Sequence, residues 1–365
     1  MKMRLAFRFA AAVLLAGCGA QPPAGTLQSA LDRQLAENAE RHGIAGQAVL
    51  ILRNGKTIYR GSHGLADREE KIAVRPDHVF PVFSVSKLFA SVLIMQLVER
   101  GELDLEAPAS RYLPDLPEGW RSITVDEFLN HVSGVPDYWG GDLATFKLPP
   151  TRKAMFEDLA SRPMQFATGN ATRYNQTNFI VLGAILETLY GKSYREIVTE
   201  RIVEPLALRD TYLGEGHVPA GEVVVSYRGE DGELVPDFDI AWTEYSIVHA
   251  ELYTTVDDLG LFLNALCDGR LLRPETLLRL WKPHRRRDGT DSFFASGWDY
   301  GTSGAYKQVG HDGGNKVRVR LLFDESLAND TYAYIYLTNG SAENVWTSRL
   351  TESLMDVLSG YDLKR

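Results

Sequence analysis

The order of apolar and polar residues divides the chain into three regions, and the first combines a helix with a hairpin. Leucines recur at every fourth position between a threonine and a glycine, which predicts a capped helix over residues 26–43. Two strand-like runs, 47–52 and 57–61, then flank Asn54-Gly55. Because this dipeptide favours the tight turn of a β-hairpin, we expect two antiparallel strands here.

In the second region the apolar residues recur mainly at helical spacing. Its first segment, 85–100, is apolar over most of its length. Further helices are predicted over residues 125–131, 155–161, 177–190, 194–202 and 255–268. The segment 177–190 is apolar on nearly all sides, which predicts a buried helix.

The third region returns to the alternation that is typical of strands. The strands are predicted after Gly297, over residues 305–309, 317–323 and 331–338. A last helix is predicted from a Ser341 cap through Trp346 to Gly360.

Strands near both ends and helices between them predict an α/β fold of the α+β kind. One antiparallel sheet, flanked by helices, would be made from the two termini, about residues 26–82 and 290–365. A helical region over about residues 83–289 would be inserted between them. We therefore expect a single domain over residues 26–365.

Residues 1–17 have the pattern of an export signal, in which basic residues precede an apolar segment too short to span a bilayer. The segment ends in Leu15-Ala16-Gly17-Cys18, which resembles a bacterial lipobox. The resemblance implies that Cys18 becomes the lipidated N-terminus and that residues 18–25 form a tether. We expect an exported, lipid-anchored protein of the bacterial cell envelope. The alternative is an ordinary signal peptide with an incidental cysteine.

Charge and cysteine content narrow the function classes further. Removing the leader lowers the net charge from −9 to −12, because it takes away three basic and no acidic residues. A nucleic-acid-binding protein is not expected at this charge. If Cys18 carries lipid, Cys267 is the one cysteine left, so no intramolecular disulfide can form. Cys267 lies in an apolar helical segment and is interpreted as a small core residue.

Candidate chemistry begins at Ser84-Val85-Ser86-Lys87, where a helix is predicted to start. The spacing places both Ser84 and Lys87 on one helix face. A neutral lysine can take the proton of a serine hydroxyl, and burial or a cationic environment favours the neutral amine. The positive end of the helix would stabilise a developing oxyanion. The alternative for Ser84 is an ordinary helix cap.

Further motif blocks surround this tetrapeptide in a fixed order. Gly64-Leu65-Ala66-Asp67 precedes it, and residues 97–105, 130–138 and 174–179 follow. Together these blocks resemble the serine β-lactamase and penicillin-binding superfamily. The branch is that of class C β-lactamases, DD-carboxypeptidases, D-aminopeptidases and related esterases. The resemblance covers about residues 44–340 and implies the fold of that superfamily.

The superfamily's second motif, Y-x-N, corresponds to Tyr174-Asn175-Gln176. The resemblance implies that Tyr174 moves protons, provided that cationic neighbours lower its pKa. Gln176 stands where the family has asparagine, and its amide can still contact Lys87 and a substrate carbonyl. The longer side chain leaves the geometry of this contact and β-lactam turnover open.

The third motif, K-T-G or H-x-G in relatives, corresponds to His311-Asp312-Gly313. The resemblance implies that substrate lies along this strand and contacts His311 and Gly313. It also implies that the backbone N–H of Gly314 joins that of Ser84 as an oxyanion hole.

The resemblance implies a serine hydrolase that acts through an acyl-enzyme on esters or on D-amino-acid-containing peptides and amides. A genuine β-lactamase is the first alternative, and a non-catalytic envelope lipoprotein that binds peptidoglycan or a partner is the second. His131 and Asp137 are interpreted as structural or cleft-lining residues rather than as a triad with Ser84.

Because no G-x-S-x-G, H-E-x-x-H or nucleotide-binding motif occurs, no metal or cofactor is expected. The expected partners are a small-molecule or peptide substrate and, through the lipid, a membrane; the oligomeric state stays open.

Overall fold

The computed structural model describes residues 25–139, 147–238 and 240–362. The predicted leader over 1–17, the lipidation site Cys18 and all but the last residue of the predicted tether lie outside these ranges. No helix in the described ranges has both the length and the apolar character needed to cross a membrane.

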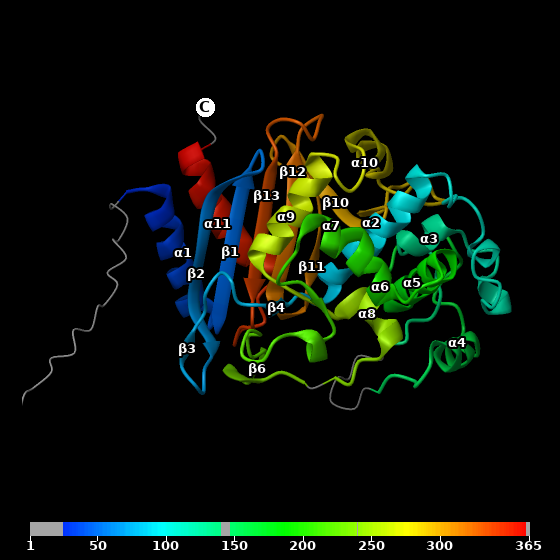
Figure 1. Ribbon diagram of the computed structural model, residues 1–365, viewed down its shortest axis with the longest axis horizontal. Coiled ribbons are helices and arrows are strands. Elements are labelled where there is room, and N and C mark those ends of the chain that lie inside the picture. Colours follow the sequence, from blue (N-terminus) through cyan, green and yellow to red (C-terminus); the bar gives the residue numbers. More distant parts are fainter. Residues whose placement is uncertain (1–24, 140–146, 239, 363–365) are drawn as a thin grey trace, which may run out of the picture.

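A large antiparallel sheet runs through the middle of the described molecule (Figure 1). Its order is β3-β2-β1-β13-β12-β11-β10-β9. The strands are β1 (Gly46–Arg53), β2 (Lys56–Asp67), β3 (Ile72–Ala73), β9 (Phe294–Ala295), β10 (Trp298–Ser303), β11 (Tyr306–Gly313), β12 (Val317–Phe323) and β13 (Tyr332–Thr338). Strand β1 pairs with β13, with Leu50 opposite Ile335. The prediction of one antiparallel sheet made from both ends of the chain is therefore confirmed.

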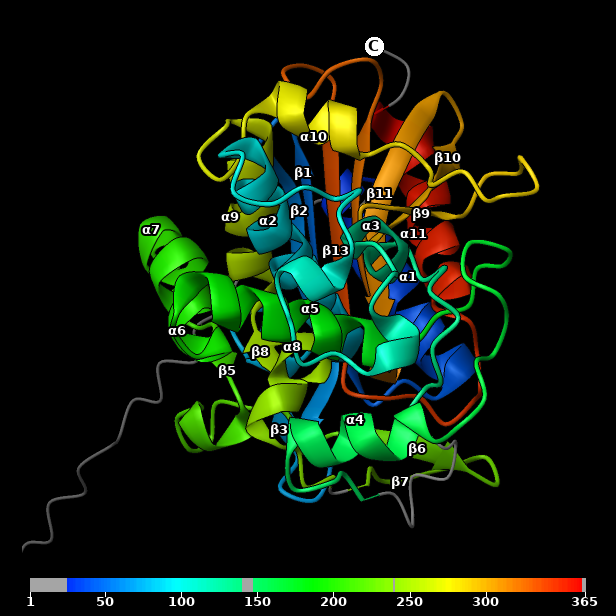
Figure 2. The ribbon, with the colours of Figure 1, turned by 90° about the vertical axis from the view of Figure 1, so that its right-hand side faces the viewer.

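Helices cover both faces of this sheet (Figures 1 and 2). They are α1 (Leu27–His42), α2 (Ser86–Glu99), α3 (Val125–Leu129), α4 (Arg152–Ala160), α5 (Gln176–Tyr190), α6 (Tyr194–Val198), α7 (Glu204–Leu206), α8 (Ile247–Ala250), α9 (Val256–Cys267), α10 (Pro274–Leu280) and α11 (Thr347–Asp362). Helices α1 and α11 pack on one face around Leu35, Tyr336 and Leu354. The other face carries the larger core, to which α2, α5 and α9 contribute. Because both faces are covered, every residue of β13 is buried.

Short strands complete the helical side. Strands β4 (Phe80–Pro81), β8 (Leu252–Thr254) and β5 (Tyr212–Leu213) form one small sheet, and β6 (Tyr227–Glu230) pairs with β7 (Glu233–Pro236). Cys267 is partly buried against the larger core, in agreement with its interpretation as a core residue.

The N-terminal helix and hairpin were predicted correctly because their signals are local. The Thr26 side chain accepts a hydrogen bond from the Ser29 N–H (3.2 Å), and Gly43 ends α1 in the left-handed conformation. The hairpin turns at Asn54 and Gly55, which both have positive φ.

Three predicted elements differ from the structure. The last helix starts at Thr347 rather than after a Ser341 cap, because Ala342 donates a backbone hydrogen bond to Gly43 (2.9 Å) and this pairing holds the segment out of the helix. The helix over 194–202 is interrupted by a π-turn from Thr199 to Val203. The helix over 125–131 ends at Leu129, and His131 has a φ of 58°. Strands β9 and β10 were not predicted, since β9 has only two residues and Asp299 and Gly301 weaken the alternation in β10.

Candidate active site

Ser84 lies in a strained turn rather than at a helix cap. The 3₁₀ turn η1 (Phe83–Val85) precedes α2, and Phe83 has a φ of 47°, which is costly for a residue with a side chain. The Ser86 hydroxyl holds the turn by donating to the Phe83 carbonyl (2.5 Å) and accepting from the Leu252 N–H of β8 (3.1 Å). The alternative interpretation of Ser84 as an ordinary helix cap is therefore wrong, because no side chain caps α2.

Lys87 is fully buried in the first turn of α2. Its Nζ lies 3.2 Å from Ser84 Oγ and donates to the backbone carbonyl of His249 at 3.0 Å. Burial lowers the pKa of Lys87 well below its ordinary value, and the carboxylates of Asp137 and Asp299 only partly oppose this. Of the two conditions that favour the neutral amine, burial is the one met here, since the charged neighbours that act on Lys87 are carboxylates.

Tyr174 lies beside this pair, with the Lys87 Nζ 5.0 Å from the centre of its ring. Its hydroxyl is buried and has no hydrogen bond of ordinary geometry to any described residue. The hydroxyl of Ser84 and the amide of Gln176 lower the pKa of Tyr174, but desolvation raises it more, to above the ordinary value. The condition that cationic neighbours lower the pKa of Tyr174 is therefore not met, because desolvation by burial outweighs the hydrogen bonds that lower it.

The loop that carries Tyr174 is fastened by the preceding motif block. The buried His131 ring packs 4.8 Å from the Tyr174 ring, and its Nδ1 accepts a hydrogen bond from the Asn175 N–H (3.2 Å). Asn175 in turn donates from its side chain to the Val135 carbonyl (2.7 Å), while Asp137 accepts from the Gln176 N–H (3.3 Å). These contacts agree with the interpretation of His131 and Asp137 as structural residues.

The third motif forms the end of β11, directly against the turn that carries Ser84. A side chain at Gly313 would meet the Val82 carbonyl oxygen at 2.3 Å, and one at Gly314 would meet the Phe83 ring at 2.9 Å. Glycines are therefore needed for this close approach. It brings Gly314 to the same cavity as Ser84.

His311 is buried in β11, with its ring 5.6 Å from that of Tyr174. Its Nδ1 donates to the Asp312 carbonyl (2.5 Å), which leaves Nε2 as an acceptor. Burial lowers the pKa of His311, so the ring is neutral near pH 7. Nε2 of His311 and Oε1 of Gln176 have no partner among the described residues, which is typical of atoms that await a ligand or water.

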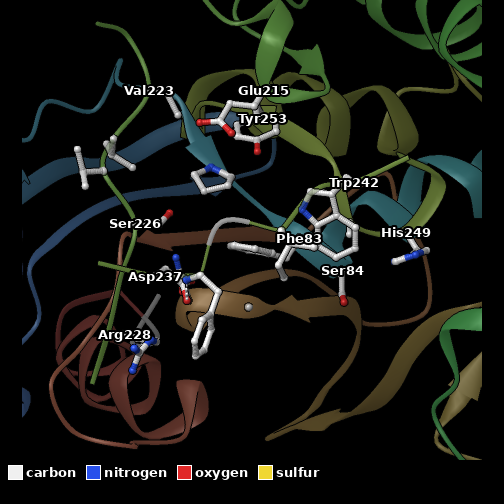
Figure 3. A pocket seen from close by; sticks show the side chains of 18 of the residues that line it. Phe83, Ser84, Glu215, Val223, Ser226, Arg228, Asp237, Trp242, His249 and Tyr253 are labelled. Atoms are coloured by element: carbon white, nitrogen blue, oxygen red, sulfur yellow. Dashed lines mark hydrogen bonds between the residues drawn. The ribbon is translucent and has the colours of Figure 1, made fainter. Parts of the chain in front are cut away.

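A cavity of about 690 Å³ opens at Ser84 (Figure 3). Of the predicted site residues, Ser84, Gln176 and Gly314 line it. Lys87, Tyr174 and His311 are not among the lining residues; Lys87 and His311 each contact the Tyr174 ring, and Gly313 packs on Val82. The structure thus brings the three distant motifs together. In the described ranges, no group of His, Cys, Asp or Glu side chains is arranged to hold a metal ion.

The sequence motifs did not reveal His249, Trp139 or Trp242, which also line the cavity. The His249 Nε2 lies 2.5 Å from the Tyr138 hydroxyl, while its backbone carbonyl contacts Lys87. Trp139 adjoins a motif block and could have been noticed there. His249 and Trp242 lie in a stretch without a motif signal, and only the fold places them here.

Comparisons with known proteins show the family of this chain. A model of the Beta-lactamase family matches residues 31–352. The chain is 32% identical over 208 residues to esterase EstB of Burkholderia gladioli. This match covers 51% of this chain and 52% of EstB. The chain is 24% identical over 349 residues to penicillin-binding protein 4* of Bacillus subtilis. This match covers 89% of this chain and 75% of that protein. The chain spans about half of the length of EstB.

Two solved structures share the fold. The D-amino acid amidase from Ochrobactrum anthropi SV3 complexed with L-phenylalanine amide has a TM-score of 0.75 at 24% identity, covering 92% of this chain and 99% of the amidase. The octameric penicillin-binding protein homologue from Pyrococcus abyssi has a TM-score of 0.76 at 22% identity, covering 91% and 77%. With the family match over most of its length, the chain belongs to the Beta-lactamase family of the serine β-lactamase and penicillin-binding superfamily.

Proposed function

We propose that this protein is a serine hydrolase that forms an acyl-enzyme on Ser84 and hydrolyses esters, or amides and peptides of D-amino acids. The observation that carries the proposal is the buried Lys87 amine 3.2 Å from the Ser84 hydroxyl. A neutral amine at this distance can act as the general base for the nucleophile.

Acylation begins when the Lys87 lone pair takes the Ser84 proton and Ser84 Oγ bonds to the substrate carbonyl carbon. The backbone N–H groups of Ser84 and Gly314 stabilise the resulting oxyanion. As the bond to the leaving group breaks, the Tyr174 phenol gives that group a proton and regains one from the Lys87 ammonium. Because burial keeps Tyr174 protonated in the resting protein, Lys87 rather than a tyrosine phenolate is the first base.

Deacylation reverses these roles. A water molecule attacks the acyl carbon and gives its proton to the Lys87–Tyr174 pair, and Ser84 recovers its hydroxyl proton as the acid is released. Gln176 and His311 are proposed to hold the substrate, since each has a buried atom without a hydrogen-bond partner among the described residues; Gln176 lines the cavity, and the His311 ring lies 5.6 Å from that of Tyr174.

The residues of this site favour esters or amides as substrates over β-lactams. Relatives with K-T-G have a permanent cation where this chain has His311, and burial keeps His311 uncharged. The carboxylate of a β-lactam antibiotic would therefore lack its cationic partner. The relative with the name of an esterase, EstB, is 32% identical over the matched residues and is consistent with this preference.

Intact-mass analysis after exposure to a fluorophosphonate, short-chain esters and penicillins tests the proposal. We expect one covalent adduct per chain with the fluorophosphonate, its loss in Ser84→Ala, and turnover of esters that exceeds that of penicillins. No adduct on Ser84 with any probe would contradict the hydrolase and favour a non-catalytic binding protein. Faster hydrolysis of penicillins than of esters would favour a β-lactamase.

We also propose export and lipid anchoring through Cys18, on the sequence pattern alone. In a bacterial host the full-length protein should partition with membranes, and Cys18→Ala should release it or leave it unprocessed. Equal membrane association of both proteins would contradict the anchor.

A further inference from the structure

One wall of the cavity beside Ser84 is built from two tryptophans. The rings of Trp139 and Trp242 stack with 6.1 Å between their centres and 8° between their planes. The Trp242 ring also meets the ring of His249 edge-on, at 5.8 Å. Figure 3 shows Trp242 and His249 on the side of the cavity where the Ser84 hydroxyl lies. Two partly exposed indole rings offer a flat apolar surface for a substrate group.

Apolar side chains continue this surface around the cavity. The additional apolar lining residues are Pro81, Phe83, Val223, Val224, Val225, Pro236, Phe238, Ile240, Ala250 and Tyr253. A volume of about 690 Å³ exceeds what an acetyl or methyl group fills. The cavity therefore fits a bulky apolar group.

The charged lining residues are unfavourable for an anion. The Arg228 guanidinium also lines the cavity; its charge is paired with Glu230 (2.5 Å) and it lies over the Phe238 ring at 4.2 Å, while its Nε has no hydrogen-bond partner among the described residues. The carboxylates of Glu215 and Asp237 also line the cavity, and neither forms an ion pair with a described residue. Figure 3 shows them away from Ser84. A substrate carboxylate in this cavity would meet two unneutralised negative charges.

We propose that the preferred substrate carries a bulky, uncharged aromatic or aliphatic group that lies on the Trp139–Trp242 wall, and that a carboxylate on this group is rejected. The inference rests on the proposed hydrolase function of Ser84 and names the substrate class of that site. Trp139 and Trp242 determine the size and polarity of the accepted group, while Glu215 and Asp237 select against anions.

The first experiment compares methyl acetate with methyl phenylpropanoate, which enlarges the acyl group, and with phenylethyl acetate, which enlarges the alcohol. We expect Trp242→Ala to lower kcat/KM for at least one phenyl ester by about 10- to 100-fold, the value of one buried aromatic group. Methyl acetate should change less than about threefold. Trp242→Phe should retain most of the activity.

Trp346→Ala is the matched control, because Trp346 is 82% exposed and does not line the cavity. It should leave all three esters unaffected. Equal losses for methyl acetate and the phenyl esters in Trp242→Ala would overturn the proposal, and so would no loss for either phenyl ester.

The charge of the substrate is tested with methyl phenylpropanoate and its para-carboxy analogue. We expect kcat/KM for the para-carboxy ester to be lower by about tenfold or more than kcat/KM for the uncharged ester. The double variant Glu215→Gln with Asp237→Asn should raise kcat/KM for the para-carboxy ester by about three- to tenfold. Equal rates for the two esters in the wild-type protein would overturn the rejection of anions.

Binding to the full-length Ser84→Ala protein separates this inference from the proposed chemistry. Calorimetry should detect methyl phenylpropanoate and not its para-carboxy analogue, and Trp242→Ala in the same background should weaken the binding. If Ser84 proves unreactive in the wild-type protein, the hydrolase proposal fails, and this binding measurement still decides whether the cavity takes an uncharged apolar group.

Discussion

Lys87 places a long polar side chain in a fully buried position, and this has two opposing effects. Removing an amine from water costs free energy, and loss of its proton reduces that cost. The burial that lowers the pKa of Lys87 therefore works against folding. The sign follows from its lowered pKa: the cost is fully present below the pKa of the folded protein and is relieved as the pH rises towards the pKa of the unfolded chain.

We therefore expect Lys87→Met to lower kcat/KM by about 10²- to 10⁴-fold, the usual value of a general base, without lowering the free energy of unfolding. The stability advantage of the variant over the wild type should shrink from acidic to mildly alkaline pH. Ester hydrolysis and urea unfolding across that pH range measure both effects. A strongly destabilised variant, or one with near-normal activity, would contradict the role of Lys87.

At the scale of elements, two close contacts place the motifs. The end of β11 approaches η1 so closely that Gly313 has no room for a side chain. On the other side of Ser84, the block 130–138 holds the start of α5 through His131 and Asn178, whose side chains lie 3.1 Å apart. Each contact joins segments that are far apart in sequence, so each controls the distance between two motifs.

Gly313→Ala should destabilise the protein by about 1–3 kcal/mol and lower kcat/KM, because the new methyl group would push β11 away from Val82. Gly301→Ala in neighbouring β10 is the control, since its methyl group would meet only the flexible Gln308 side chain at 3.2 Å. Urea unfolding and ester hydrolysis of both variants check this. Equal effects of the two substitutions would argue against a special close approach at Gly313.

His131→Phe should keep the ring packing around Tyr174 and lose the acceptor for the Asn175 N–H. A buried donor left without its partner costs about 1–3 kcal/mol, so we expect a lower melting temperature together with a lower kcat. Thermal unfolding and active-site labelling report on the two separately. Unchanged stability would show that His131 does not fasten the Tyr174 loop.

At the scale of the whole molecule, the sheet separates two cores. The smaller core, between the sheet and α1 and α11, lies on the opposite face of the sheet from α2 (Figure 1). Stability lost in the smaller core should therefore leave the geometry around Ser84 largely unchanged.

Leu354→Ala in α11 should lower the free energy of unfolding by about 2–5 kcal/mol, since Leu354 is fully buried in the smaller core. The kcat of the folded fraction should stay within about twofold of the wild type. Glu352→Ala, an exposed position on the same helix, should change neither value. A large loss of kcat in Leu354→Ala at a temperature where it is folded would contradict the separation of the two cores.

Local patterns determined much of this protein. Helix caps, the Asn54-Gly55 turn and the three-residue spacing of Ser84 and Lys87 act over a few residues, so the sequence alone predicts helix α1, the first hairpin and the contact between Ser84 and Lys87. The ordered motif blocks added Tyr174 and the His311 strand, and the alternation near both ends predicted one sheet.

Only the tertiary structure decided the electrostatics and the shape of the site. Desolvation depends on every segment that packs around a group, so the lowered pKa values of Lys87 and His311 and the raised pKa of Tyr174 follow from burial rather than from neighbours in sequence. The Trp139–Trp242 wall joins two segments that share no pattern. Its position depends on the fold, because stacking of two rings requires a spatial proximity that no local spacing encodes.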